Sequence, residues 1–122
     1  AKYPDALKKV LELMRSNIEE PLTLEELLHY ASVSRRQLER NFREMFDRSP
    51  KQYYTDLRLE RAHAFLGDTN MLIIEIASAT GFTSSAYFAK RFLSRYGISP
   101  SGLRLNRKEG KNYASIAKSG AD

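Results

Sequence analysis

The side chains best suited to chemistry in this sequence are charged residues crowded into one short stretch. They are Arg35, Arg36, Glu39, Arg40 and Arg43. At a helical repeat of 3.6 residues they share the face opposite Leu38 and Phe42. A guanidinium fork can bond O6 and N7 of guanine together or grip a phosphate, and a carboxylate can accept from the cytosine amino group. This pattern favours nucleic-acid contact; the alternative is a solvated face on which Glu39 only holds Arg36 or Arg43.

A second stretch fifty residues further on has the same spacing but smaller side chains. Its outward positions are Ser85, Ala86, Ala89 and Lys90, opposite Phe88 and Phe92. Small residues permit close approach to a base, and an alanine methyl can touch a thymine methyl. Lys90 and Arg91 are expected to hold phosphates. Tyr87, at the margin of this face, is read either as a packing residue or as a DNA contact.

Catalytic and metal-binding chemistry have no such support. There is no cysteine, and the two histidines, His29 and His63, stand alone in helical stretches. No glycine-rich phosphate loop follows a strand, and no His/Asp/Glu cluster has metal-ligand spacing. We therefore expect no enzyme, no cofactor and no metal.

The charge distribution agrees with a phosphate-facing surface. Residues 1–30 hold four Lys/Arg against six Asp/Glu, whereas residues 31–110 hold fourteen against eight, in a chain of net charge +5. A basic region of this kind attracts nucleic acid. No segment resembles a membrane span or a signal peptide, and the missing cysteines fit a reducing cytoplasm.

Helical periodicity and capping residues predict an all-α fold with about seven helices. The expected helices cover residues 4–19, 24–31, 34–46, 50–66, 70–79 and 84–96, with a last short one from 99. Capping boxes are expected at Thr23–Glu26, Ser34–Gln37 and Ser49–Gln52, and a cap at Asn70.

The long helix over residues 50–66 is expected to act as a strut that ends at Gly67. A single apolar face is assigned to it, made of Tyr53, Leu57, Ala62, Phe65 and Leu66. Arg58 and Arg61 lie on this helix. Either can touch phosphate or pair with Asp56 or Glu60.

An internal repeat with a period of fifty residues organises these helices. Leu22, Glu25, Ser34, Phe42, Ser49 and Pro50 recur as Leu72, Glu75, Ser84, Phe92, Ser99 and Pro100. A short helix, a tight turn and a basic second helix form the helix-turn-helix pattern, whose second helix lies in the DNA major groove. The expected organisation is a first helix-turn-helix subdomain at 1–49, a linker helix at 50–66, a second subdomain at 67–106 and a flexible tail at 107–122. Residues 24–46 and 74–96 are expected to superpose without an insertion.

The order of parts resembles the AraC/XylS family of transcription regulators over residues 5–106. The resemblance rests on Ser49-Pro50-x-x-Tyr53-x-x-x-Leu57-Arg58-Leu59-x-x-Ala62, Ile74-x-Ile76-Ala77-x-x-x-Gly81-Phe82-x-Ser84-x-x-Tyr87-Phe88-x-Lys90-x-Phe92 and Tyr96-Gly97-x-Ser99-Pro100. It implies a monomeric domain of seven helices whose two reading helices enter successive major grooves. Base readout falls on Arg36, Glu39, Arg40, Ser85, Ala86 and Lys90. Phosphate contacts fall on Ser34, Arg35, Arg43, Lys51, Arg58, Ser84, Tyr87, Arg91 and Arg95.

The resemblance also implies partners: operator DNA, RNA polymerase for the many members that are activators, and an N-terminal effector-sensing domain. The first helix and the segment around Arg36 are most similar to members with an inert amidotransferase-like sensor. The start at Ala1 suggests a piece of a longer protein. Two alternatives stay open, a helical protein–protein adaptor and a small free-standing regulator that bends DNA.

Overall fold

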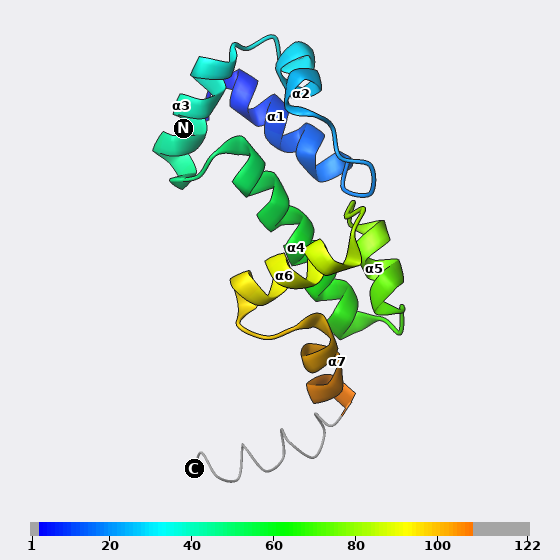
Figure 1. The fold of residues 1–122 in the computed structure, drawn as a ribbon. Coiled ribbons are helices and arrows are strands. Elements are labelled where there is room, and N and C mark those ends of the chain that lie inside the picture. Colours follow the sequence, from blue (N-terminus) through cyan, green and yellow to red (C-terminus); the bar gives the residue numbers. More distant parts are fainter. Residues whose placement is uncertain (1–2, 109–122) are drawn as a thin grey trace.

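The computed structural model describes residues 3–108, and every regular element in that range is a helix. The seven helices are α1 (Asp5–Ser16), α2 (Leu24–Ala31), α3 (Arg35–Phe46), α4 (Pro50–Asp68), α5 (Ile73–Ala79), α6 (Ser85–Tyr96) and α7 (Pro100–Lys108). Helices α1–α3 lie at one end of α4, and α5–α7 lie at the other (Figure 1). The predicted all-α class with two helix-turn-helix units joined by a long helix is confirmed.

The first end of the molecule packs around side chains from α1, α2, α3 and the start of α4. Its buried members are Leu7, Val10, Leu11, Met14, Leu27, Leu38, Phe42 and Tyr54. The rings of Phe42, Phe46 and Tyr53 contact one another, with centroids 4.5–5.4 Å apart. Aromatic pairs at these separations add to the hydrophobic stabilisation that comes from burial, so α3 is held firmly on α4.

The second end has its own core, built from the remainder of α4 with α5 and α6. Its buried members are Leu59, Ala62, Leu66, Ile76, Ala77, Phe82, Phe88 and Phe92. Helix α7 closes it: Arg104 donates to the carbonyls of Leu66 (3.2 Å) and Met71 (2.8 Å), and Arg107 donates to Leu66 at 3.0 Å. These cations satisfy the carbonyl of Leu66 in the last turn of α4, which has no helical partner, and that of Met71 in the segment before α5.

Helix α4 therefore presents two apolar faces, each to a different core, and the single face predicted from sequence was wrong. Tyr54 and Leu57 pack on the first core, whereas Leu59 and Ala62 are buried in the second. Since both cores include side chains of α4, neither subdomain is complete without this helix.

Several helix ends differ from the sequence-based expectation. α1 ends at Ser16 rather than 19, where the Asn17 side chain donates to the Leu13 carbonyl at 2.8 Å. α4 continues through Gly67 to Asp68. The tail was predicted to begin at 107, but Arg107 and Lys108 are helical; the remainder of it, 109–122, lies outside the described residues.

The capping predictions fare unevenly. The boxes at Thr23–Glu26 and Ser49–Gln52 form in full. Ser34 caps α3 by accepting from the Gln37 amide, but the Gln37 side chain donates to Asn41 at 2.9 Å instead of reaching back. The predicted cap at Asn70 was wrong, because α5 begins after Leu72. The Leu72 amide donates to the Glu75 side chain at 2.8 Å.

The two helix-turn-helix units do not repeat with the single register seen in the sequence. Up to the turn the equivalent positions are 49 residues apart: Thr23 and Leu72 precede the short helices, and Ser32 and Gly81 are the left-handed residues, with φ of 52° and 85°. After the turn the offset becomes fifty, since Phe42 matches Phe92 in the core.

The second turn is therefore one residue longer, and the prediction of a repeat without insertion was wrong. Thr83 is the additional residue, between Phe82, which matches Val33, and the cap Ser84. As a consequence Ile73, not Ile74, occupies the position of Leu24, and Ile74 is 65% exposed.

Candidate nucleic-acid interface

Helix α3 turns a charged face away from the first core. Leu38 and Phe42 are fully buried, which leaves Arg36, Glu39 and Arg40 exposed. Among the described residues none of these three is in an ion pair. The alternative in which Glu39 holds Arg36 or Arg43 is thus not observed: Arg43 pairs with Asp47 at 3.4 Å. Three of the six side chains predicted to read bases are thus exposed on one face of α3, outside the ion pairs of the described residues.

Helix α6 repeats this arrangement with different side chains. Phe88 and Phe92 are fully buried, and Ser85, Ala86 and Lys90 are exposed. Tyr87 is 47% exposed, with its ring 6.2 Å from that of Phe82. It therefore packs against Phe82 at one edge and is exposed at the other, and its contact with DNA stays a prediction.

Two cavities show how α3 and α6 lie relative to each other. The larger, of about 620 Å³, is lined by Arg35 and Glu39 from the start of α3 and by Tyr87 from the start of α6. The other, of about 420 Å³, is lined by Arg43 from the second half of α3 and by Arg91 from α6. Because the first parts of both helices meet at one cavity and the later parts at the other, α3 and α6 run in the same direction across α4.

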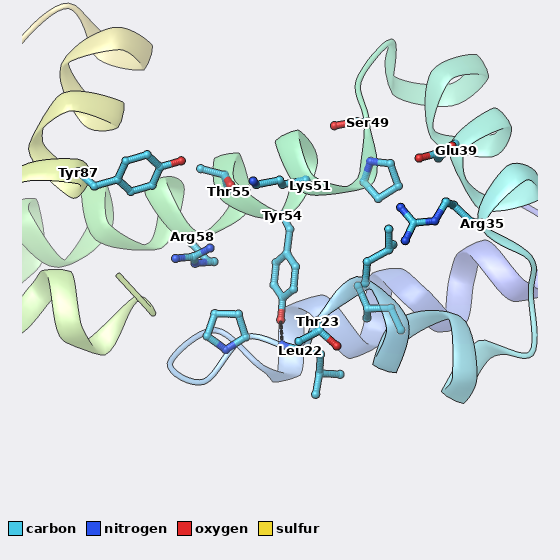
Figure 2. A pocket seen from close by; sticks show the side chains of 14 residues that line it. Leu22, Thr23, Arg35, Glu39, Ser49, Lys51, Tyr54, Thr55, Arg58 and Tyr87 are labelled. Carbon is cyan, nitrogen blue, oxygen red and sulfur yellow. Dashed lines mark hydrogen bonds between the residues drawn. The ribbon is translucent and has the colours of Figure 1, made fainter. Parts of the chain in front are cut away.

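The larger cavity gathers four of the predicted phosphate contacts (Figure 2). Arg35, Lys51, Arg58 and Tyr87 line it. Thr55, which the sequence analysis missed, lines it too, one helical turn after Lys51 on the same face of α4. That i, i+4 spacing was the signal that could have identified Thr55. Arg35 also pairs with Glu25 at 3.1 Å, an exposed contact that can exchange for a phosphate.

The remaining predicted phosphate contacts lie elsewhere. Ser34 and Ser84 are helix caps whose hydroxyls accept from the amides of Gln37 and Tyr87, both at 3.1 Å. Arg95 is paired with Asp56 at 3.4 Å and with Glu60 at 2.8 Å, so its charge is already matched. Asp56 also pairs with Arg48 at 2.9 Å.

Arg58 has partners that the sequence did not suggest. Its Nε and Nη2 donate to the carbonyls of Thr80 and Gly81, both at 2.8 Å, and its guanidinium lies 4.2 Å from the centre of the Phe82 ring. Burial lowers the pKa of Arg58, but an arginine guanidinium in a protein keeps its charge. Pairing with Asp56 or Glu60, the alternative considered from sequence, does not occur among the described residues.

Tyr54 was also missed, because the sequence analysis placed only its neighbour Tyr53 on the apolar face of this helix. Its hydroxyl accepts from the Leu22 amide at 3.1 Å and donates to the Asn17 carbonyl, in the loop between α1 and α2. Burial raises the pKa of Tyr54, so the hydroxyl keeps the proton that it donates.

Two further searches complete the picture of the described residues, 3–108. Within them no three His, Asp or Glu side chains gather closely enough to hold a metal ion. No helix in this range has the length and apolar character that a bilayer crossing requires.

Comparison with known proteins relates this geometry to a family. A helix-turn-helix domain family matches residues 27–106. The transcriptional regulator GbdR of Pseudomonas aeruginosa is 45% identical over 105 residues, which are 86% of this chain and 29% of GbdR. The chain thus spans under a third of that relative's length.

Solved structures agree in fold. An AraC-type transcriptional regulator from Chromobacterium violaceum superposes with a TM-score of 0.79 at 39% identity, over 84% of this chain and 91% of the other. The DNA-binding domain of AdpA, solved in complex with a target DNA, gives a TM-score of 0.80 at 27% identity, over 87% and 96%. The chain belongs to the AraC family of helix-turn-helix domains.

Proposed function

We propose that this domain binds double-stranded DNA in a sequence-specific manner, with α3 and α6 entering successive major grooves of one duplex. The observation that carries the proposal is the parallel course of two exposed helices that share a cavity lined by cationic side chains. Parallel helices on one side of a rigid body can meet major grooves that recur on one face of DNA. The complex of the similar AdpA domain with its target DNA supports the same reading.

In this proposal the two helices contribute differently. Arg36, Glu39 and Arg40 read base edges from α3, because forked and acidic side chains discriminate bases. From α6, Ser85 and Ala86 make close apolar or hydroxyl contacts, and Lys90 adds a point charge. Phosphates are held by Arg35, Lys51, Tyr87, Arg43 and Arg91.

The test compares affinities for a DNA selected from a random pool and for scrambled duplexes across a range of salt concentrations. Specific binding should weaken steeply with salt, by about 0.9 in the slope of log affinity against log salt for each phosphate contact. Lys8→Ala on α1 removes the same charge as Arg40→Ala and serves as the matched control. Equal affinity for every duplex, or equal effects of the two variants, would remove base readout from the proposal.

We infer that the domain works as part of a longer transcription regulator rather than as an enzyme. Support comes from GbdR, a transcriptional regulator of which this chain matches 29%. An effector-sensing domain, contact with RNA polymerase and a cytoplasmic location, where bacterial DNA lies, belong to the same proposal. The measurement is transcription in vitro by the full-length regulator with RNA polymerase, with and without the operator upstream. Transcription that ignores the operator would refute a regulatory role.

A further inference from the structure

The two subdomains touch directly at the turn between α5 and α6. Gly81, in that turn, lies against the loop between α1 and α2 so closely that there is no space for a side chain. A Cβ built on Gly81 would stand 2.5 Å from the Ile18 carbonyl oxygen and 2.6 Å from Cγ of Pro21. Ordinary contact begins near 3.4 Å, so the loop or the turn would have to move by about 0.9 Å.

Helix α4 holds both sides of this contact from two side chains one helical turn apart. Tyr54 binds the α1–α2 loop through Leu22 and Asn17. Arg58 binds the α5–α6 turn through the carbonyls of Thr80 and Gly81. Residues at i and i+4 share a helix face, and Figure 2 shows Tyr54 and Arg58 next to each other along α4, with the Tyr54 hydroxyl bonded to Leu22 of the α1–α2 loop.

The contact lies next to the start of α6. Gly81 precedes the first residue of that helix, Ser85, by four residues, and the Phe82 ring that follows it is buried under the Arg58 guanidinium. A displacement of the turn is therefore transmitted to α6. Without this contact the course of α6 relative to α3 would depend on α4 and its two cores alone.

We propose that Tyr54, Arg58 and Gly81 form an inter-subdomain joint that fixes α6 relative to α3 and thereby sets the spacing of DNA half-sites that the domain accepts. The effect on half-site spacing rests on the proposed DNA binding, whereas the placement of α6 relative to α3 does not. Arg58 is a positioning residue in this proposal, although it also lines the cavity where phosphate contacts are expected.

The free protein tests the placement without DNA. Since the chain has no cysteine, Met45→Cys on α3 and Leu93→Cys on α6 give two unique labelling positions, 44% and 50% exposed. Electron–electron double resonance between spin labels at these positions measures the distance between the helices. The parent protein should give one narrow distribution, and Gly81→Ala should shift or broaden it.

Gly97→Ala is the matched control. Gly97 has a φ of 73°, close to the 85° of Gly81, but no atom lies within 4 Å of a Cβ built on it. Both variants carry the strain of a left-handed alanine, and only Gly81→Ala carries the collision. Equal distributions in the two variants would overturn the proposal.

Arg58→Gln provides a second test that keeps Gly81 in place and covers a Gly81→Ala that fails to fold. It removes the guanidinium that binds the Thr80 and Gly81 carbonyls, so the distance distribution should broaden. Arg61→Gln, at an exposed position of the same helix, should leave that distribution unchanged. A distribution unchanged by Arg58→Gln would also overturn the joint.

DNA binding gives the second readout. Affinities are measured for duplexes whose half-sites are separated by the selected spacing or by one base pair more or less. The parent protein and Gly97→Ala should prefer one spacing, and Arg58→Gln and Gly81→Ala should lose that preference. The comparison uses the ratio of affinities between spacings, because a lost phosphate contact lowers the affinity for every spacing alike and cancels in that ratio. Retained preference in both joint variants would refute the spacing role, and no DNA binding by the parent would refute the proposed function while leaving the spin-label result to decide the joint.

Discussion

Inserting five base pairs between the two half-sites should reduce the affinity of this domain to that for a single half-site. The insertion turns one half-site by about half a helical turn and moves it about 17 Å further away, since B-DNA repeats every 10–10.5 base pairs or about 34 Å. Helix α4, with 19 residues, spans only about 28 Å at 1.5 Å per residue. The contact at Gly81 leaves no slack for α6 to follow its half-site.

The size of the loss follows from the side chains that α6 would withdraw. Lys90 and Arg91 are the cationic side chains expected to contact DNA from α6, so the slope of log affinity against log salt should fall by about 1.8, at about 0.9 for each charge. If α3 and α6 lie closer together than one full turn of straight DNA, binding to the original site carries a further cost, because the duplex then has to bend, at about 1–6 kcal/mol.

Fluorescence anisotropy on duplexes with zero, five and ten inserted base pairs measures this directly. Ten base pairs restore the facing of the half-site but double its distance, so a rigid protein should still bind only one half-site. A domain with independent, flexibly joined units would recover affinity at ten base pairs. Affinity equal to that for the original site at five base pairs would refute the rigid arrangement.

Other predictions concern single side chains. Arg40→Ala should relax the base preference in one part of the DNA site and cost about 1–3 kcal/mol of binding free energy. Lys90→Ala should instead lower the affinity for all DNA sequences alike. Affinities for duplexes with single-base changes distinguish these outcomes, and an equal loss on every sequence for Arg40→Ala would contradict its base contact. Phe92→Ala should lower the free energy of unfolding by about 3–5 kcal/mol in urea, because the fully buried ring leaves a cavity; a loss below 1 kcal/mol would contradict the second core. Burial raises the pKa of Tyr54 above its ordinary 10.0, so the folded state holds this proton more tightly than the unfolded state. The resulting stability is present below pH 10 and is lost as the pH rises through the folded-state pKa; Tyr54→Phe should flatten that loss in unfolding measured across pH 9–12, and an unchanged curve would exclude Tyr54 as its source.

The parts of this fold that were predictable from sequence are those fixed by local physics. Thr23 and Ser49 cap helices because a hydroxyl three residues before a Glu or Gln satisfies free amides at a helix start. Leu38 and Phe42 are buried because their spacing of four puts them on one helix face. The exposed residues of α3 were predictable for the same reason, because they occupy the helix face opposite Leu38 and Phe42.

The register of the repeat was not predictable in the same way. Identical residues, such as Glu25 and Glu75, suggested one offset through the whole unit, yet Glu75 caps α5 in the way Glu26 caps α2. The start of a short helix is decided by which residues its core accepts, and the second core accepts Ile73 and Ile76. A one-residue insertion in a turn leaves little trace in sequence when the left-handed residue is serine in one unit and glycine in the other.

The tertiary role of Arg58 was beyond the sequence for a related reason. Its partners are backbone carbonyls more than twenty residues away, and a carbonyl carries no residue-type signal. Sequence reasoning assigns an arginine to the nearest acid or to a ligand, because only those are visible as residue types. The same limit hid Tyr54, whose hydroxyl also binds backbone.

The joint gives the weaker reading helix a way to contribute to specificity. Ser85 and Ala86 offer few hydrogen bonds to bases, so α6 is expected to discriminate little by direct contact. A helix held at a fixed distance and angle from α3 nevertheless rejects every site whose second groove is out of place. It also rejects sequences that resist the bend needed to bring that groove within reach, because the cost of bending depends on the sequence. Under these proposals specificity is divided: α3 would select bases through Arg36, Glu39 and Arg40, and the contact at Gly81 would select the geometry of the DNA that follows.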